Sequence, residues 1–208
     1  MKRKTMKKNN KFRSGPFLVM LLLLAVAVAC HKSYTPKPHG YFRIDFPEKK
    51  YTQYQSDCGY GFEYPVYGTI TPFQGAVAEP CWINIEFPAY HGKIRLTYKD
   101  VGNNNVAAYA EDIRTLAYKH NIKADDIIER QVSFPDRKVY GLVYDIRGNT
   151  ASSLSFYLTD STSHFISGAM YFSVKPNKDS LAPVIRFFSK DVDHLIEILF
   201  RSGITFCI

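Results

Sequence analysis

The sequence predicts an α+β fold in which two amphipathic helices cover a mainly antiparallel sheet. The first indication is a run of three segments within residues 139–174 in which apolar and polar side chains alternate, as they do on the two faces of a sheet. The second is a pair of apolar stripes at helical spacing, within 106–117 and 181–199, which is typical of helices packed on one side. The order of strands, helix, strands and helix offers few parallel crossovers.

The amino terminus has the features of a targeting segment. Residues 1–29 contain no acidic residue, and a basic stretch leads into an apolar segment from Phe17 to Ala29. A helix of that length covers about 20 Å, which is short of the roughly 30 Å hydrocarbon layer of a bilayer. We therefore predict a signal peptide over residues 1–29 rather than a permanent membrane span.

Cys30 directly follows Ala27-Val28-Ala29. This placement resembles a bacterial lipobox, in which the cysteine is acylated with chains such as palmitate and becomes the new amino terminus. The same three residues also fit an ordinary A-x-A cleavage site, which would release a soluble secreted protein. We favour lipidation of Cys30, because a cysteine would rarely fall at this one position by chance. Two or three acyl chains, at about 0.8 kcal/mol per buried methylene, would anchor the protein firmly. Residues 30–40, with two prolines, then form a tether.

The net charge of +8 does not indicate nucleic-acid binding. Seven of the 27 basic residues precede residue 14, which leaves 20 basic residues against 19 acidic ones in the rest of the chain. A nearly neutral domain has no electrostatic footprint for a phosphate backbone. We predict one globular domain over residues 41–201, followed by a tail, 202–208, that shows no pattern.

The first half of this domain is expected to contain short strands and one hairpin. Short strands are predicted over 41–46 and 62–66, with a loop over 69–80. Residues 81–87 and 93–99 then alternate cleanly and are expected to pair. The residues predicted to face inward are Ile83, Ile85, Phe87, Ile94, Leu96 and Tyr98, and those predicted to face outward are Lys93, Arg95, Thr97 and Lys99.

The second half should alternate helix, strands and helix. Asn103 to Asn105 offer a cap for the first helix, and Asp179 or Ser180 offers one for the last, with Pro183 in its first turn. A strand is expected over 127–134. The meander that follows should turn at Gly148-Asn149 and at the loop 160–163. By element order alone, a sandwich like that of the PsbP or Mog1 proteins is the nearest analogy.

Two cysteines of the predicted domain, Cys58 and Cys81, lie in a compartment that permits disulfides. Closing a loop of this size would stabilise the fold by roughly 3 kcal/mol in the chain-entropy model. The alternative is a pair of reduced, buried cysteines. We favour a disulfide, which leaves Cys207 as the odd cysteine.

The candidates for catalysis and metal binding have simpler explanations. Asp160, Ser161 and His164 invite comparison with a hydrolase triad, but Asp, Ser and Thr are also what a four-residue loop needs to bond its own backbone. The six histidines show no H-x-H or H-E-x-x-H spacing, and no C-x-x-C is present. We therefore expect no enzyme activity, no cofactor and no metal. A polar and aromatic face of the meander either lines a pocket, meets a partner or is solvated; it comprises Ser153, Ser155, Tyr157, Ser167, Tyr171 and Ser173.

Several segments carry a resemblance to a known family: 38–47 (PHGYFRIDFP), 81–84 (CWIN), 96–99 (LTYK), 118–120 (YKH) with 123–124 (KA), 139–142 (VYGL), 148–153 (GNTASS), 159–162 (TDST) and 176–180 (PNKDS). Together they resemble the GldD family of gliding motility-associated lipoproteins from Bacteroidetes. The resemblance covers roughly residues 35–200, and the order and spacing of the segments make it specific.

This resemblance implies an envelope lipoprotein that supports gliding and the associated type IX secretion machinery, and it implies no catalytic residues. We expect partners among other envelope proteins, a membrane contact through the lipid, and no nucleic acid. The lipid-anchored protein should face the periplasm, and we favour the outer membrane over the inner membrane as the site of the anchor. The alternative function is a periplasmic lipid- or small-molecule-binding module, motivated by the small residues Gly168 and Ala169 and the serines of the meander.

Overall fold

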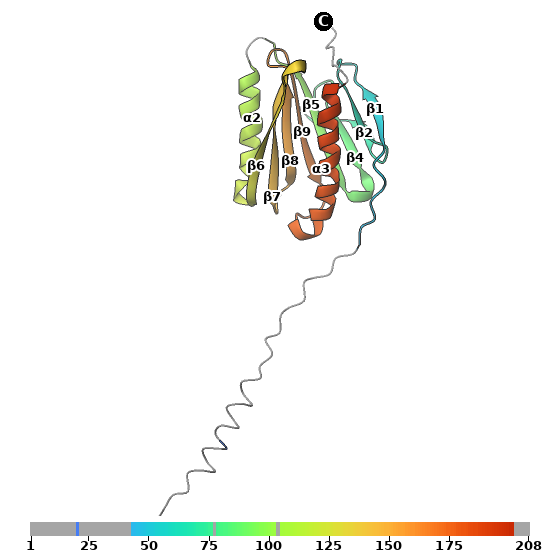
Figure 1. The fold of residues 1–208 in the computed structure, drawn as a ribbon, viewed down its shortest axis with the longest axis vertical. Helices are drawn as coiled ribbons and strands as arrows, with labels where there is room; N and C mark the ends of the chain where they lie inside the picture. Colours follow the sequence, from blue (N-terminus) through green and yellow to red (C-terminus); the bar gives the residue numbers. More distant parts are fainter. Residues whose placement is uncertain (1–19, 21–42, 77, 103–104, 202–208) are drawn as a thin grey trace, which may run out of the picture. The chain divides into compact units, whose positions relative to one another are not determined.

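A seven-stranded antiparallel sheet organises the domain (Figure 1). Its strands are β3 (Thr69–Pro72), β4 (Ile83–Phe87), β5 (Gly92–Asp100), β6 (Ala124–Phe134), β7 (Val139–Gly148), β8 (Ser152–Thr159) and β9 (His164–Phe172). They follow the order β3-β4-β5-β9-β8-β7-β6, and each neighbouring pair is antiparallel. The predicted α+β class with a mainly antiparallel sheet is therefore confirmed, and β9 of the predicted meander is its middle strand.

The computed structural model describes residue 20 and residues 43–76, 78–102 and 105–201. Cys30, the tether over residues 30–40, and the tail over residues 202–208 with Cys207 lie outside the described residues, as does the predicted signal peptide apart from Met20.

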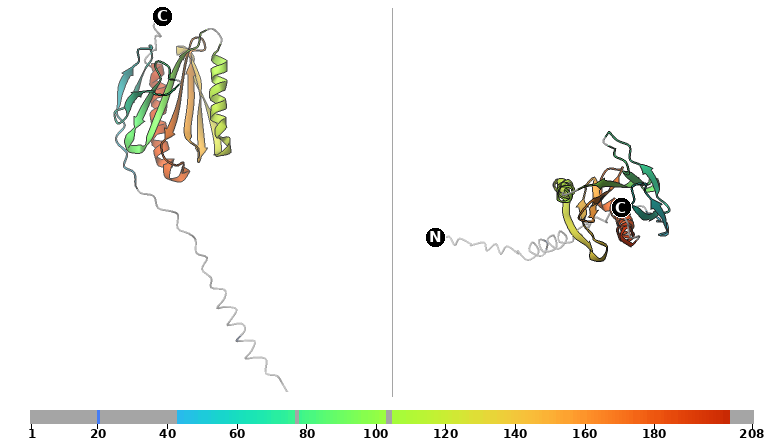
Figure 2. Two further views of the ribbon diagram at one scale, coloured as in Figure 1. Left: turned by 180° about the vertical axis from the view of Figure 1, so that it is seen from behind. Right: turned by 90° about the horizontal axis from the view of Figure 1, so that it is seen from above.

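Two helices and a separate hairpin complete the described fold. Helix α2 (Val106–Tyr118) and helix α3 (Lys178–Arg201) lie on opposite faces of the sheet, as the two views of Figure 2 show. The strands β1 (Tyr51–Gln55) and β2 (Gly61–Pro65) pair only with each other and pack beside α3. Short 3-10 turns occupy Pro88–Tyr90 (η1), Lys119–Ile122 (η2) and Pro135–Arg137 (η3).

The main core lies between the sheet and α3. The apolar stripe predicted for this helix is buried there, with Phe188, Val192 and Leu195 almost inaccessible to solvent. The sheet contributes its inward-facing residues, including Ile85 and Phe156, which are fully buried. Burying each such side chain contributes about 1.5–3 kcal/mol, so this face supplies most of the driving force for folding.

The opposite face of the sheet is covered only in part. Helix α2 packs over β8 and β9, and a second, smaller core forms where Ala117 meets Tyr144 and Ile146 of β7. Burial raises the pKa of Tyr144 to about 12, so its phenol stays protonated. The main contacts of α2 with the sheet do not include β3 or β4.

Two segments differ from their predicted structure. Residues 43–50 form no strand, and the first strand begins only at Tyr51. Instead, Phe46 stacks on Phe187 of α3 with ring centroids 4.4 Å apart. Residues 69–72, predicted as loop, form the edge strand β3, which ends at Pro72. Proline has no amide N–H to donate, and an edge strand tolerates this because one of its sides has no neighbouring strand.

The connections of the second half also differ in detail. The turn after β7 spans residues 149–151, because Gly148, at a φ of 121°, still pairs with Ala124 of β6. Helix α3 is capped by Asn177, whose Oδ1 accepts hydrogen bonds from the amides of Asp179 (3.1 Å) and Ser180 (3.3 Å). Because the helix begins at Lys178, Pro183 falls in its second turn rather than its first.

Candidate functional site

A cavity of about 400 Å³ lies between helix α2 and the sheet. Its floor comes from β5, β8 and β9, and its roof from α2 and the turn η2. Its polar side chains include Arg95, Thr97, Lys99, Ser155 and Ser167, and its aromatic ones are Trp82, Tyr109, Phe165 and Tyr171. Sites for small molecules typically enclose roughly 300–1,000 Å³, with a few polar groups in an apolar lining. This cavity falls within that description.

The alternation of β5 determines which of its side chains enter the cavity. Ile94 and Leu96 point to the main core, so Arg95, Thr97 and Lys99 point to the α2 side. The sequence predicted these three residues to face outward. The structure places them on the predicted side of the strand, but they are only partly exposed and line the cavity.

The two cations of the cavity have different surroundings. Lys99 forms an ion pair of 2.8 Å with Glu79, and its ammonium lies 5.5 Å from the ring of Trp82 and 5.4 Å from that of Tyr109. The guanidinium of Arg95 lies over the ring of Phe73, 4.3 Å from its centroid. The Nε atom of Arg95 is buried and has no hydrogen-bond partner.

The polar face predicted for the meander is divided by α2. Ser155, Ser167 and Tyr171 line the cavity, and the hydroxyls of Ser167 and Thr97 are 2.6 Å apart. Tyr157 instead stacks on Phe165, with ring centroids 5.3 Å apart, and joins the smaller core. Part of this face therefore lines a pocket, which is one of the alternatives that the sequence left open.

Two further ionisable residues border the cavity. His120, in η2, is half-buried, and burial lowers its pKa below its ordinary value, so the imidazole is neutral at neutral pH. Asp112, on α2, is exposed at the rim. Neither residue belongs to a sequence motif that pointed to a pocket.

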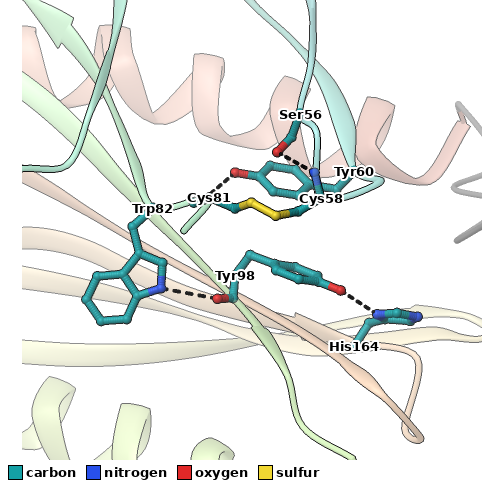
Figure 3. The surroundings of a disulfide bond; sticks show 7 residues. All are labelled: Ser56, Cys58, Tyr60, Cys81, Trp82, Tyr98 and His164. Carbon is teal, nitrogen blue, oxygen red and sulfur yellow. Dashed lines mark hydrogen bonds between the residues drawn. A yellow bond between two sulfur atoms is a disulfide. The ribbon is translucent and has the colours of Figure 1, made fainter. Parts of the chain in front are cut away.

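A disulfide between Cys58 and Cys81 joins the loop of the β1–β2 hairpin to the start of β4, with the two Cα atoms 6.2 Å apart (Figure 3). The hydroxyl of Tyr60 donates a hydrogen bond of 2.7 Å to the carbonyl of Cys81. The next residue, Trp82, lines the cavity and donates its indole N–H to the carbonyl of Tyr98 at 3.1 Å. The disulfide therefore adjoins the cavity wall.

We expect that replacing both Cys58 and Cys81 by serine lowers the free energy of unfolding by about 3 kcal/mol, because the bond closes a loop with a sequence separation of 23 residues. Chemical denaturation with and without a reductant measures this effect. The double variant is the control, since reductant should not change its stability. A wild-type protein that is equally indifferent to reductant would contradict the expectation.

Of the three residues that resembled a hydrolase triad, Asp160 binds the backbone of its own loop. Oδ1 of Asp160 accepts hydrogen bonds from the amides of Thr162, Ser163 and His164, at 2.9–3.0 Å. Although burial acts in the other direction, these bonds hold the pKa of Asp160 below its ordinary value. Nδ1 of His164 lies 2.8 Å from the hydroxyl of Tyr98. The loop chemistry expected for Asp160 is therefore present in the structure.

The histidines are spread over the described part of the chain. His91 lies after η1, His120 at the cavity, His164 at the start of β9 and His194 on α3, 2.9 Å from Glu63. Within residues 43–76, 78–102 and 105–201, no three histidine, cysteine, aspartate or glutamate side chains gather as a metal-binding group.

A buried carboxylate, missed in the sequence, ties the first described segment to α3. The side chain of Asp191 is completely inaccessible to solvent and lies 2.7 Å from the ammonium of Lys49. It also accepts hydrogen bonds from Tyr51 (2.9 Å) and Tyr67 (2.7 Å). Burial, and then the bond to Asp191, raises the pKa of both phenols, so they remain donors. A signal was present, because Asp191 stands three residues after Phe188 and four before Leu195, on the apolar stripe.

These observations define a class: an α+β domain with one well-packed sheet face and a polar, aromatic cavity under the helix on the other face. Neither described helix has a stretch of apolar sequence long enough to cross a bilayer. The family model for "Gliding motility lipoprotein GldD" matches residues 31–200, so the chain belongs to this family of lipoproteins. The resemblance inferred from the sequence is therefore confirmed, and membership implies an anchor in a membrane of the cell envelope.

The other comparisons are more distant. The search of curated proteins gave no match. Among solved structures, the solution structure of cyanobacterial PsbP (CyanoP) from Synechocystis sp. PCC 6803 is similar, with a TM-score of 0.43 and 14% identity over 76% of this chain and 98% of that chain. PsbP is one of the two folds named above by analogy of element order.

Proposed function

We propose that this lipoprotein is a non-enzymatic component of the envelope machinery for gliding motility and the associated type IX secretion. The observation that carries the proposal is the family match over residues 31–200. Acylation of Cys30, the residue directly before the matched range, is part of the same proposal. The periplasmic face, in the outer rather than the inner membrane, is part of the same proposal, as are partners among other envelope proteins.

The surroundings of two carboxylates support a role in binding rather than in catalysis. The carboxylate of Asp160 is occupied by three backbone amides of its own loop. Asp191, the most deeply buried carboxylate described, is occupied by Lys49, Tyr51 and Tyr67. Both groups therefore serve the fold, and what the cavity offers is charge, hydroxyls and aromatic surface.

The test is deletion of the gene in a gliding host, followed by complementation. We expect the deletion to abolish colony spreading and to retain type IX cargo in the cells, and the wild-type chain to restore both. Crosslinking in intact cells should then identify envelope partners. A deletion strain that spreads and secretes normally would contradict the proposal; in a host that does not glide, secretion alone decides.

Complementation with Cys30→Ser tests the anchor. We expect this variant to be exported but released from membranes, because the described domain has no second anchor in its helices and the chain after the leader is nearly neutral. Membrane fractionation and labelling with a palmitate analogue give the result. An unlabelled wild-type protein in the soluble periplasm would show that Ala27-Val28-Ala29 is an ordinary cleavage site.

A second candidate function is a small-molecule-binding module, and the cavity beneath α2 specifically favours it. The two functions are compatible, since a component of an envelope machine can be regulated by a ligand. They are also separable, because a defect in the cavity need not disturb the lipid anchor.

A further inference from the structure

The cavity beneath α2 contains a cation that is not neutralised by the described residues. Arg95 forms no ion pair within residues 43–76, 78–102 and 105–201, and its buried Nε has no hydrogen-bond partner. Its contacts with the described residues are with ring faces: its guanidinium lies 4.3 Å from the centroid of Phe73 and 5.6 Å from that of Tyr171. A buried donor without an acceptor costs roughly 1–3 kcal/mol, and more when the group is charged. Arg95 therefore carries a charge that no described acid neutralises. Its terminal nitrogens, which are not among the buried atoms without a partner, are the donors available to an acceptor that enters from the cavity.

The remaining charges limit how much negative charge such a ligand can carry. Lys99 is already paired with Glu79 at 2.8 Å, and burial lowers the pKa of His120 so that it is neutral. Asp112, exposed at the rim, would repel additional negative charge. Among the described residues that line the cavity, Arg95 is thus the one cation open to a new partner, which favours a ligand with a single negative charge.

The walls and the size of the cavity define the rest of the ligand. Ile113 and Ala117 of α2 face Phe165 and Ala169 of β9 across the cavity, which gives apolar surface beside Arg95. A volume of about 400 Å³ suits one short chain or ring system and is too small for a lipid with two acyl chains. The planar guanidinium fork matches a carboxylate in a bidentate geometry.

We propose that this cavity binds a small amphiphilic monocarboxylate, with its carboxylate on Arg95 and its apolar body between α2 and β9. The proposal rests on the second candidate function, the small-molecule-binding module. It adds the chemical class of the ligand and the residue that selects it.

Trp82 makes the proposal directly measurable, because it is the only tryptophan of the chain and it lines the cavity. The full-length acylated protein in lipid nanodiscs is titrated with octanoate at neutral pH, and empty nanodiscs correct for partition into lipid. We expect a saturable change in tryptophan fluorescence. Octanol, which lacks the charge, and octyl phosphate, which carries more of it, should each bind at least about tenfold more weakly.

Variants separate ligand binding from structure. Arg95→Gln should weaken octanoate binding by at least about tenfold, and Ala169→Leu, which fills the cavity from β9, should abolish it. The matched control is Lys93→Gln, which removes a cation from the same side of β5 but outside the cavity. It should bind octanoate like the wild type, and all three variants should keep the wild-type thermal unfolding midpoint within a few degrees.

Three results would overturn the inference. Octanol binding as tightly as octanoate would show an apolar cavity without carboxylate selection. A fluorescence change that survives Ala169→Leu would place the probe elsewhere. A loss of stability without a loss of affinity in Arg95→Gln would show that Arg95 stabilises the fold rather than binding a ligand. Its partner would then be Asn84, which is opposite Arg95 on the neighbouring strand β4 and whose Oδ1 is also buried without a partner. None of these results would affect the role in gliding, which the deletion strain tests independently.

Discussion

Replacement of Asp191 by alanine is expected to lower the free energy of unfolding by about 3–5 kcal/mol. The side chain is fully buried, and its removal leaves the ammonium of Lys49 and the hydroxyls of Tyr51 and Tyr67 without their shared acceptor. Lys49 is only partly exposed, and burial already lowers its pKa. An uncompensated charge at this site is therefore costly. The urea midpoint measures the change, provided that the slope of the transition is unchanged.

Asp193→Ala is the matched control for this prediction. Asp193 lies two residues further along α3 and is also paired, with Arg130 at 2.9 Å, but its side chain is 49% exposed. Exposed pairs of this kind contribute up to about 1 kcal/mol. If Asp191→Ala costs no more than Asp193→Ala, the Asp191 network does not hold residues 49–67 to the helix.

The network has a consequence for a lipid-anchored protein. Lys49 and Tyr51 belong to the first described segment of the domain, and Phe46 of the same segment stacks on Phe187 of α3. The ammonium of Lys49 also donates to the carbonyl of Phe187 at 2.9 Å. The described residues that follow the predicted tether are thus held to α3 by charge, hydrogen bonds and ring contacts together.

Most of the strands that the sequence predicted have one face buried in the main core; β6, in which no residue is fully buried, is the exception. Ile83, Ile85, Leu96 and Phe156 alternate with polar residues because a packed core selects every second position. The strands that were missed lack this constraint. In β1 no residue is fully buried, and β3 is a four-residue edge strand that ends at Pro72, so neither shows a period.

The cavity could not be predicted in the same way. The polar side chains at every second position of β5 produce the same sequence pattern whether they face water or a polar cavity under a helix. Only the position of α2 over β8 and β9 decides between the two, and that position depends on contacts such as Ala117 with Tyr144. Ser155, Ser167 and Tyr171 were identified as a possible pocket lining because they are small or aromatic, but Arg95 carried no signal of its own.

Gly168 illustrates how the two faces of the sheet differ, and its replacement is the second change expected to lower the stability of the fold strongly. The small size of Gly168, with that of Ala169, suggested ligand space when only the sequence was considered. In the structure, a Cβ atom on Gly168 would collide with the ring of Phe156 and approach Leu96 to 3.0 Å. Its missing side chain therefore makes room for the main core rather than for the cavity.

Gly168→Val should accordingly lower the free energy of unfolding by about 3 kcal/mol, because Phe156 is fully buried and cannot move aside without strain. Ala169→Val is the matched control, since Ala169 is the next residue along β9 and lines the cavity; it should cost less than about 1 kcal/mol. Combining Gly168→Val with Phe156→Leu should cost less than the sum of the two single changes, since the smaller side chain relieves the overlap. Chemical denaturation of the four variants gives the comparison. Strict additivity, or equal costs at positions 168 and 169, would mean that the strand relaxes around the new side chain and that Gly168 is not required for the packing of Phe156.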